Sequence, residues 1–224
     1  MSLDKSKTDE ELGKKIANWL TEKGVQTPMT ITSLFPVDNK MVLIEDKFST
    51  ILEVIGLDLT DDSLKETPKR MAKMFVNELF WGLEYKNFPK ITTVENKMGY
   101  EEMVIERDIN VMSVCEHHLV TIHGKAHIAY IPNKKVLGLS KLNRITEYFC
   151  KRPQIQERIG QQIFHTLQHL LETDDIAVVI EAEHFCVKSR GVEDINSDTV
   201  TSKLGGRFMT NPHLRAEFMS LIKK

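Results

Sequence analysis

Apolar residues near the start of the chain recur at the three- and four-residue spacing of an amphipathic helix. They are Leu12, Ile16, Trp19 and Leu20. Gly24 follows where such a helix would end, and Pro28 and Pro36 bracket the connector behind it. We expect this helix either to extend from the main body toward another subunit or to fold back on its own core, and the pattern leaves both open.

Two further helices are predicted before residue 80. The first ends at Gly56, and its apolar face consists of Phe48, Ile51, Leu52 and Ile55. In the second, Thr67 is the expected N-cap and Pro68 the first helical residue, with Arg70 close behind. Its methionine-rich stripe is typical of a packed core rather than a cofactor site, and it consists of Met71, Met74, Phe75 and Leu79.

Alternating, β-branched residues predict two strands, at 102–114 and 119–131, joined as a hairpin. In the second strand His123 and His127 fall on the polar face, which favours a solvent or subunit contact over a metal site. Two helices follow, one opened by Ser140 and one after Pro153. A strand at 176–187 then begins a second hairpin, whose other strand is expected within 198–209.

This order of elements predicts an α+β fold with a four-stranded antiparallel sheet. Helices would cover one face of the sheet, and a helical region would precede it. We expect residues 1–40 to form an N-terminal helix and connector, and residues 41–224 to form the main domain. The open edges of such a sheet invite pairing with neighbouring subunits.

The bend of the first hairpin carries a cluster of side chains that can bind metal. Cys115 and His118 lie there, and the period of two along 176–187 places His184 and Cys186 on one face. Two thiolates and one imidazole suit zinc and leave a fourth tetrahedral position for water. His117 and His184 would remain beside the metal for proton transfer near neutral pH. Because the third ligand is distant in sequence, a chance Cys-x-x-His beside ordinary buried cysteines is the alternative.

Composition limits the classes of protein that need to be considered. A chain of 224 residues with 41% hydrophobic content can bury one main domain with an appendage. A net charge of −2 gives no support for nucleic-acid binding, so any basic site must be local. Three cysteines argue against a disulfide framework, and neither a signal peptide nor a membrane span is evident. We therefore expect a cytoplasmic protein.

Six stretches of sequence resemble the GTP cyclohydrolase I family, and they lie in family order between about residues 58 and 208. They are ETPKR at 66–70, FPKI at 88–91, CEHH at 115–118, GLSKLNR at 138–144, RPQIQER at 152–158 and HFCVKSRG at 184–191. The resemblance implies conversion of GTP to 7,8-dihydroneopterin triphosphate with release of formate, the first step of pterin and folate biosynthesis. It also implies the tunnelling fold, in which the sheets of five subunits close into a β-barrel and two pentamers stack into a homodecamer.

The resemblance also assigns the reacting groups, with residues 41–224 as the catalytic domain. A zinc ion that activates water for attack on C8 of the purine would be held by Cys115, His118 and Cys186. His117 and His184 would protonate a ring nitrogen and assist opening of the imidazole ring. Ser140 would assist the later rearrangement of the sugar, although an N-cap role alone also fits it.

Substrate contacts follow in the same way. Gln156 and Glu157 resemble the family's guanine anchor, since a carboxylate can accept hydrogen bonds from N1 and the exocyclic amino group. Without the motif, Glu157 would be read as a solvated helix residue. A triphosphate needs several cations, and those in or beside the motifs are Arg70, Lys141, Arg144, Lys188 and Arg190.

Two other functions stay open on the sequence. A nitrile reductase of the queuosine pathway shares the fold and would use a cysteine nucleophile and a nicotinamide cofactor. A non-catalytic interaction protein could use zinc only to hold the two hairpins together. Bound zinc and release of formate from GTP would exclude the first, and turnover of GTP would exclude the second.

Overall fold

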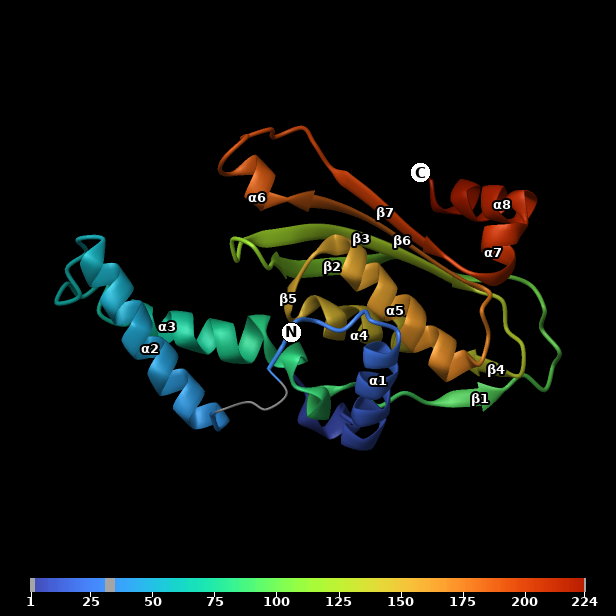
Figure 1. Ribbon diagram of the computed structural model, residues 1–224, viewed down its shortest axis with the longest axis horizontal. Coiled ribbons are helices and arrows are strands. Elements are labelled where there is room, and N and C mark those ends of the chain that lie inside the picture. The colour runs from blue at the N-terminus through green and yellow to red at the C-terminus, as the bar shows by residue number, and fades with distance from the viewer. Residues whose placement is uncertain (1–2, 31–34, 224) are drawn as a thin grey trace.

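A computed structural model describes residues 3–30 and 35–223, apart from the side chains of residues 37 and 38 (Figure 1). Its centre is a five-stranded sheet in the order β5-β2-β3-β6-β7. The strands are β2 (Val104–Cys115), β3 (Thr121–Tyr130), β5 (Pro153–Gln154), β6 (Ile176–His184) and β7 (Thr199–Leu204). All pairs are antiparallel except β5, which runs parallel to β2.

The α+β class and both hairpins are confirmed, but the expected four-stranded antiparallel sheet is wrong. The fifth strand, β5, contains only two residues, which is too short to leave a period in the sequence. It pairs Pro153 and Gln154 with Val114 and Cys115. A separate two-stranded sheet of β1 (Thr93–Glu95) and β4 (Lys135–Leu137) was missed for the same reason.

The predicted strand at 176–187 is too long. Strand β6 ends at His184, and a helical turn, α6 (Phe185–Lys188), carries Cys186. The amide of Ser189 closes this turn on the carbonyl of Phe185 at 3.0 Å. His184 and Cys186 therefore do not share a strand face. The alternating apolar pattern continues past His184 in sequence, but the backbone has already turned toward the first hairpin.

One face of the sheet is covered by α4 (Leu139–Cys150) and α5 (Gln156–Leu171), with α1 (Glu10–Glu22) packed outside α5 (Figure 1). Ile16 and Leu20 of α1 are fully buried in the main core. The indole Nε1 of Trp19 donates to the carbonyl of His165 on α5 at 2.8 Å. Of the two expectations for the first helix, folding back on its own core is the one the structure shows.

The expectation that helices cover only one face of the sheet is wrong. At the end of the sheet opposite α6, α7 (Gly206–Thr210) and α8 (Pro212–Ile222) cover the second face (Figure 1). Phe208 and Phe218 pack there against small or branched residues of β3, of β6 and of the position directly after β3, namely Ala129, Ala177, Val179 and Ile131. The C-terminal helices were missed because α7 has only five residues and the apolar residues of α8 do not form a single stripe, with Leu221 exposed beside the buried Phe218 and Ile222.

The remaining helices form an arm that projects from the body (Figure 1). In the arm α2 (Val37–Val54) packs along α3 (Thr67–Lys73) and the π-helical turn after it, η2 (Met74–Leu79). Three 3-10 turns lie outside the arm. One precedes α1, η1 (Lys5–Lys7), and two follow the arm and lead into the body, η3 (Trp81–Leu83) and η4 (Tyr85–Asn87). A domain boundary at residue 40 falls inside α2 and stays a prediction, and part of the expected connector, 31–34, lies outside the described residues.

Two predicted N-caps are wrong. Helix α3 begins at Thr67 with Glu66 as its N-cap, and α4 begins at Leu139 with Gly138 as its N-cap. Thr67 and Ser140 therefore lie inside the first turn, and neither cap position makes a side-chain bond to the helix. Proline at the second position of α3 already supplies the helical φ that starts a helix. Thr67 is thus not needed as a cap.

Arg152 fixes the segment that leads into β5. Its side chain is fully buried, and the guanidinium carbon lies 4.8 Å from the ring centre of Tyr148 and 5.1 Å from that of Phe149. The guanidinium donates to the carbonyl of Gly82 and to the hydroxyl of Thr27. No carboxylate in the described part of the chain pairs with this buried charge, so these aromatic and polar contacts help to offset its desolvation.

Candidate metal centre and nucleotide site

The turn between β2 and β3 places two predicted ligands side by side. The amide of Cys115 donates to the carbonyl of Val120 at 2.8 Å, and the amide of Leu119 donates back to Cys115 at 2.9 Å. Leu119 takes a left-handed φ of 53°, which closes the turn. Residues three apart on a regular strand would point to opposite faces, so this irregular turn is what lets Cys115 and His118 face one space, as predicted.

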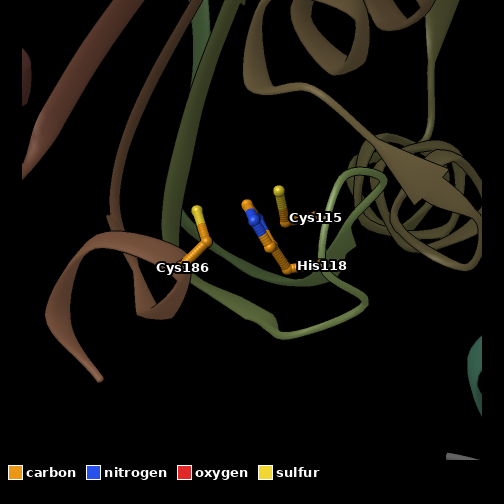
Figure 2. A group of neighbouring side chains, drawn as sticks. All are labelled: Cys115, His118 and Cys186. Atoms are coloured by element: carbon orange, nitrogen blue, oxygen red, sulfur yellow. The ribbon is translucent and has the colours of Figure 1, made fainter. Parts of the chain in front are cut away.

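The three predicted metal ligands meet. One ligand atom from each of Cys115, His118 and Cys186 lies within 4.8 Å of the others, and Figure 2 shows the three side chains directed into the same space. Cys115 is buried, Cys186 is half-buried and His118 is exposed. No second group of this kind occurs in the described part of the chain.

The chemistry of this group fits zinc. Burial and the neighbouring Cys115 thiol raise the pKa of Cys186, because two thiolates at this separation repel each other without a cation between them. A bound divalent ion would reverse that effect. Two sulfurs and one nitrogen are ligands that zinc prefers, and three protein ligands leave one tetrahedral position open.

The two predicted proton-transfer histidines flank the metal group. Nδ1 of His117 lies 3.7 Å from Sγ of Cys115, and its side chain is 65% exposed. His184, at the end of β6, places Nε2 2.7 Å from Oε1 of Gln156. Burial lowers the pKa of His184, while the charge of Glu157 on the first turn of α5 acts in the opposite direction. The predicted guanine anchor therefore lies within electrostatic reach of His184.

An ion pair that was missed in the sequence ties the turn to α5. The Arg158 guanidinium binds both carboxylate oxygens of Glu116, at 2.5 and 3.3 Å, and its hydrogen bond lowers the pKa of Glu116. The amide of Glu116 donates to the carbonyl of Gln154 at 3.0 Å. The available signal was one acidic residue inside CEHH and one basic residue inside RPQIQER, but only the fold shows that they meet.

The predicted phosphate contacts separate into groups. Nη1 of Arg190 lies 3.1 Å from Nε2 of His118, beside the metal group. Lys188 is held by Glu183 at 3.0 Å and by the carbonyl of Ile195 at 2.7 Å, so its ammonium already has partners. Arg70 lies on α3, in the projecting arm.

The remaining predicted residues lie at the other end of the sheet. Ser140, Lys141 and Arg144 belong to the first turns of α4, which starts directly after β4 (Figure 1). Burial lowers the pKa of Lys141, and the charges of Arg144 and Lys90 lower it further. These three neighbouring cationic side chains favour the binding of an anion.

The length of β2 gives the distance between these cations and the metal group. Asn143 of α4 donates to Glu106, near the start of β2, at 3.3 Å, whereas Cys115 ends that strand. The nine residue steps from Glu106 to Cys115 span about 30 Å at the rise of a strand. One chain therefore does not bring the α4 cations to its own metal group.

The chain is similar to known proteins over nearly its whole length. A family model described as GTP cyclohydrolase I matches residues 44–223. GTP cyclohydrolase 1 of Shewanella denitrificans is 55% identical over 209 residues, which cover 93% of this chain and 96% of that protein. GTP cyclohydrolase 1 of Shewanella sp. strain ANA-3 is 54% identical over 95% of this chain and 98% of its own length. That of Vibrio vulnificus is 54% identical over 93% and 96%.

Among the described residues, no helix has the length and the apolar composition that crossing a bilayer requires.

Proposed function

Because the chain belongs to the GTP cyclohydrolase I family, we propose that it converts GTP to 7,8-dihydroneopterin triphosphate with release of formate, using the group Cys115, His118 and Cys186. The observation that carries this proposal is the meeting of these ligand atoms within 4.8 Å of one another. The reaction opens pterin and folate biosynthesis. A nitrile reductase would instead use a cysteine nucleophile and a nicotinamide cofactor, so bound zinc and released formate would exclude it.

When bound there, zinc supplies Lewis acidity that lowers the pKa of water toward about 7 beside C8 of the purine. Cys115 and His118 would hold the ion from the first hairpin, and Cys186 would hold it from the helical turn after β6. Arg190, beside His118, adds positive charge at the rim of the site. The fixed positive charge of Arg190 would favour the negative charge that develops when water attacks the purine ring.

Two histidines move the protons in the proposed reaction. His184 uses Nε2 to bind Gln156, which leaves Nδ1 to exchange a proton with the opening imidazole ring. His117 is exposed beside Cys115 and can exchange protons with solvent. Glu157, exposed on the first turn of α5, would accept hydrogen bonds from N1 and the exocyclic amino group of guanine.

We further propose that the phosphate-binding cations of each site come from more than one subunit. Ser140, Lys141 and Arg144 lie far from the metal group of their own chain. Within the described residues, the sheet also has unpaired edges, at β7 and along β2 beyond its two-residue contact with β5. Pairing of these edges in a homodecamer of two pentamers would remove them and supply the missing cations.

The proposed activity is tested by incubating the purified protein with GTP and measuring formate, the pterin product and bound zinc. Cys186→Ala should lose most of the zinc and all turnover. Cys150→Ala is the matched control, because Cys150 is buried in the core and burial raises its pKa to about 12, so it is no ligand. Stoichiometric zinc in Cys186→Ala would refute the metal assignment. A zinc-loaded wild-type protein that releases no formate would refute the function.

A further inference from the structure

We infer that Gln156 is a positioning residue that orients His184, rather than a contact of the guanine base. The inference rests on the proposed function, because it concerns the histidine that moves protons there. Gln156 is the first residue of α5 and is 1% exposed. Its amide lies between strands β6 and β7 on one side and the His184 ring on the other.

The surroundings of Gln156 fix which way its amide points. Nε2 lies 3.0 Å from the carbonyl oxygen of Ile180 and 2.9 Å from that of Thr199. The hydroxyl of Thr201 is a third neighbour, at 3.1 Å. A carbonyl oxygen can only accept, so the amide must direct its N–H groups at both strands. The flipped amide would set its oxygen against two carbonyl oxygens in a buried site, which is costly.

This orientation determines the state of His184. Oε1 of Gln156 lies 2.7 Å from Nε2 of His184 and carries no hydrogen, so Nε2 must donate. A neutral His184 ring therefore keeps its proton on Nε2 and its lone pair on Nδ1. Gln156 thus sets both the ring plane of His184 and the nitrogen that faces the reaction.

The same contacts leave Gln156 little capacity to bind a base. Both amide hydrogens are used by the strands, the oxygen accepts from His184, and the side chain is closed off from solvent. Glu157, the next residue, is exposed and can reach a ligand. The two neighbours therefore have different roles, with Glu157 contacting guanine and Gln156 supporting the histidine.

The test compares Gln156→Met, which loses the acceptor, with Gln156→Glu, whose protonated form keeps an acceptor oxygen for His184 and still donates to a strand carbonyl. The buried position beside two carbonyl oxygens favours that protonated form. Gln156→Met should lower kcat about 10- to 100-fold, with zinc content and the KM for GTP close to wild type. Gln156→Glu should recover part of kcat. Gln162→Met is the matched control, because Gln162 is also buried on α5 but binds Gln154 and Thr27 instead, and its kcat should stay near wild type.

A rise of tenfold or more in KM with unchanged kcat in Gln156→Met would overturn the inference in favour of a base contact. A nitrogen-15 spectrum of labelled histidine, assigned with His184→Ala, gives a readout that does not need turnover. Wild-type His184 should show the Nε2–H tautomer, and Gln156→Met should show a mixture. An Nδ1–H tautomer in the wild type would overturn the inference even if Gln156→Met fails to fold, and it would do so whether or not formate is released.

Discussion

Glu116 shows how a residue that binds neither metal nor substrate can still set the geometry of a site. It stands next to Cys115 in the turn, and both its amide and its carboxylate are tied to the segment that opens α5. The side chains of Glu116 and Arg158 are 24% and 15% exposed, so solvent screens the pair less than an ordinary surface ion pair. Its main effect is to hold the ligand-bearing turn against α5.

Arg158→Met should weaken zinc binding about tenfold, because supporting contacts of metal ligands typically contribute that much. Competition with a chromophoric chelator measures the zinc affinity directly. Arg207→Met is a matched control, since it breaks an arginine–carboxylate pair with Asp175 at the far end of β7. Equal zinc affinity in Arg158→Met and wild type would mean that the backbone bond from Glu116 to Gln154 holds the turn by itself.

The sequence predicts which residues bind the metal better than it predicts which residues hold the site's side chains in place. Thiols and imidazoles are rare enough that Cys115, His118 and Cys186 could be selected before any fold was known, and the structure confirms that they meet. Gln156 was assigned to guanine because its motif resembles an anchor. Which partner a buried amide binds depends on the strands around it, and that information exists only in the folded chain.

Helices and strands were predictable from the sequence where the periodic pattern of apolar residues extends over several repeats. The amphipathic stripes of α1, α4 and α5 and the alternation of β2 and β3 were recognised because each extends over ten or more residues. The two-residue β5 and the helical turn that carries Cys186 were not, since a period needs several repeats to appear. These short elements are the ones that close the site.

Strand β3 contains a histidine whose environment differs from the solvent-facing one that alternation indicated. His127 is only 3% exposed, and its Nδ1 accepts from the amide of Asp108 at 3.3 Å. Asp108 has a left-handed φ of 59° at the point where the β2–β3 register shifts. The irregularity in β2 thus covers His127.

Burial lowers the pKa of His127 below 6.5; the charges facing it are Glu181 and Asp108, which oppose the shift, and Lys125 and Arg107, which add to it. Below about pH 6.5 the unfolded chain therefore binds more protons at this position than the folded chain, and stability falls as the pH drops. His127→Gln keeps an acceptor and does not titrate.

Urea unfolding at pH 7.5 and pH 5.5 measures this effect, since other titrating groups are shared by both proteins. The variant should lose less unfolding free energy than wild type between the two pH values. Equal losses in the two proteins would mean that His127 titrates as it does in the unfolded chain.

At the scale of the whole molecule, the predicted site is divided between two ends of one sheet. The metal group lies at the β2–β3 turn and the helical turn after β6, and the α4 cations lie near the start of β2. The sequence could name both halves, because each lies in a recognisable motif. It could not show their separation, since motif order along a chain says nothing of the distance between them.

Two inactive variants from different halves should therefore rescue one another. Cys186→Ala removes the metal and Lys141→Ala removes a proposed phosphate contact, so mixed oligomers would contain sites built from two intact halves. Roughly a quarter of the sites should be active at equal mixing, if each half comes at random from a different subunit. Turnover of coexpressed or reassembled oligomers measures this fraction. Cys186→Ala mixed with His118→Ala is the control, because both changes affect the same half and no rescue is expected.

Mixed oligomers of Cys186→Ala and Lys141→Ala, verified by mass spectrometry, that stay inactive would contradict the shared site. The phosphate contact would then belong to the same chain as the metal, or Lys141 to no site.

The two cysteines of the metal group are separated by more than seventy residues, and this distance gives the ion a mechanical role. A permanent cross-link closing a loop of that length would restrict the unfolded chain by roughly 4 kcal/mol. Coordination closes the same loop reversibly, and it joins the β2–β3 turn to the helical turn after β6. Bound zinc would thus hold these two turns together. Removing it with a chelator should speed hydrogen exchange first at the amides of Cys115 and Leu119, before the strands themselves open.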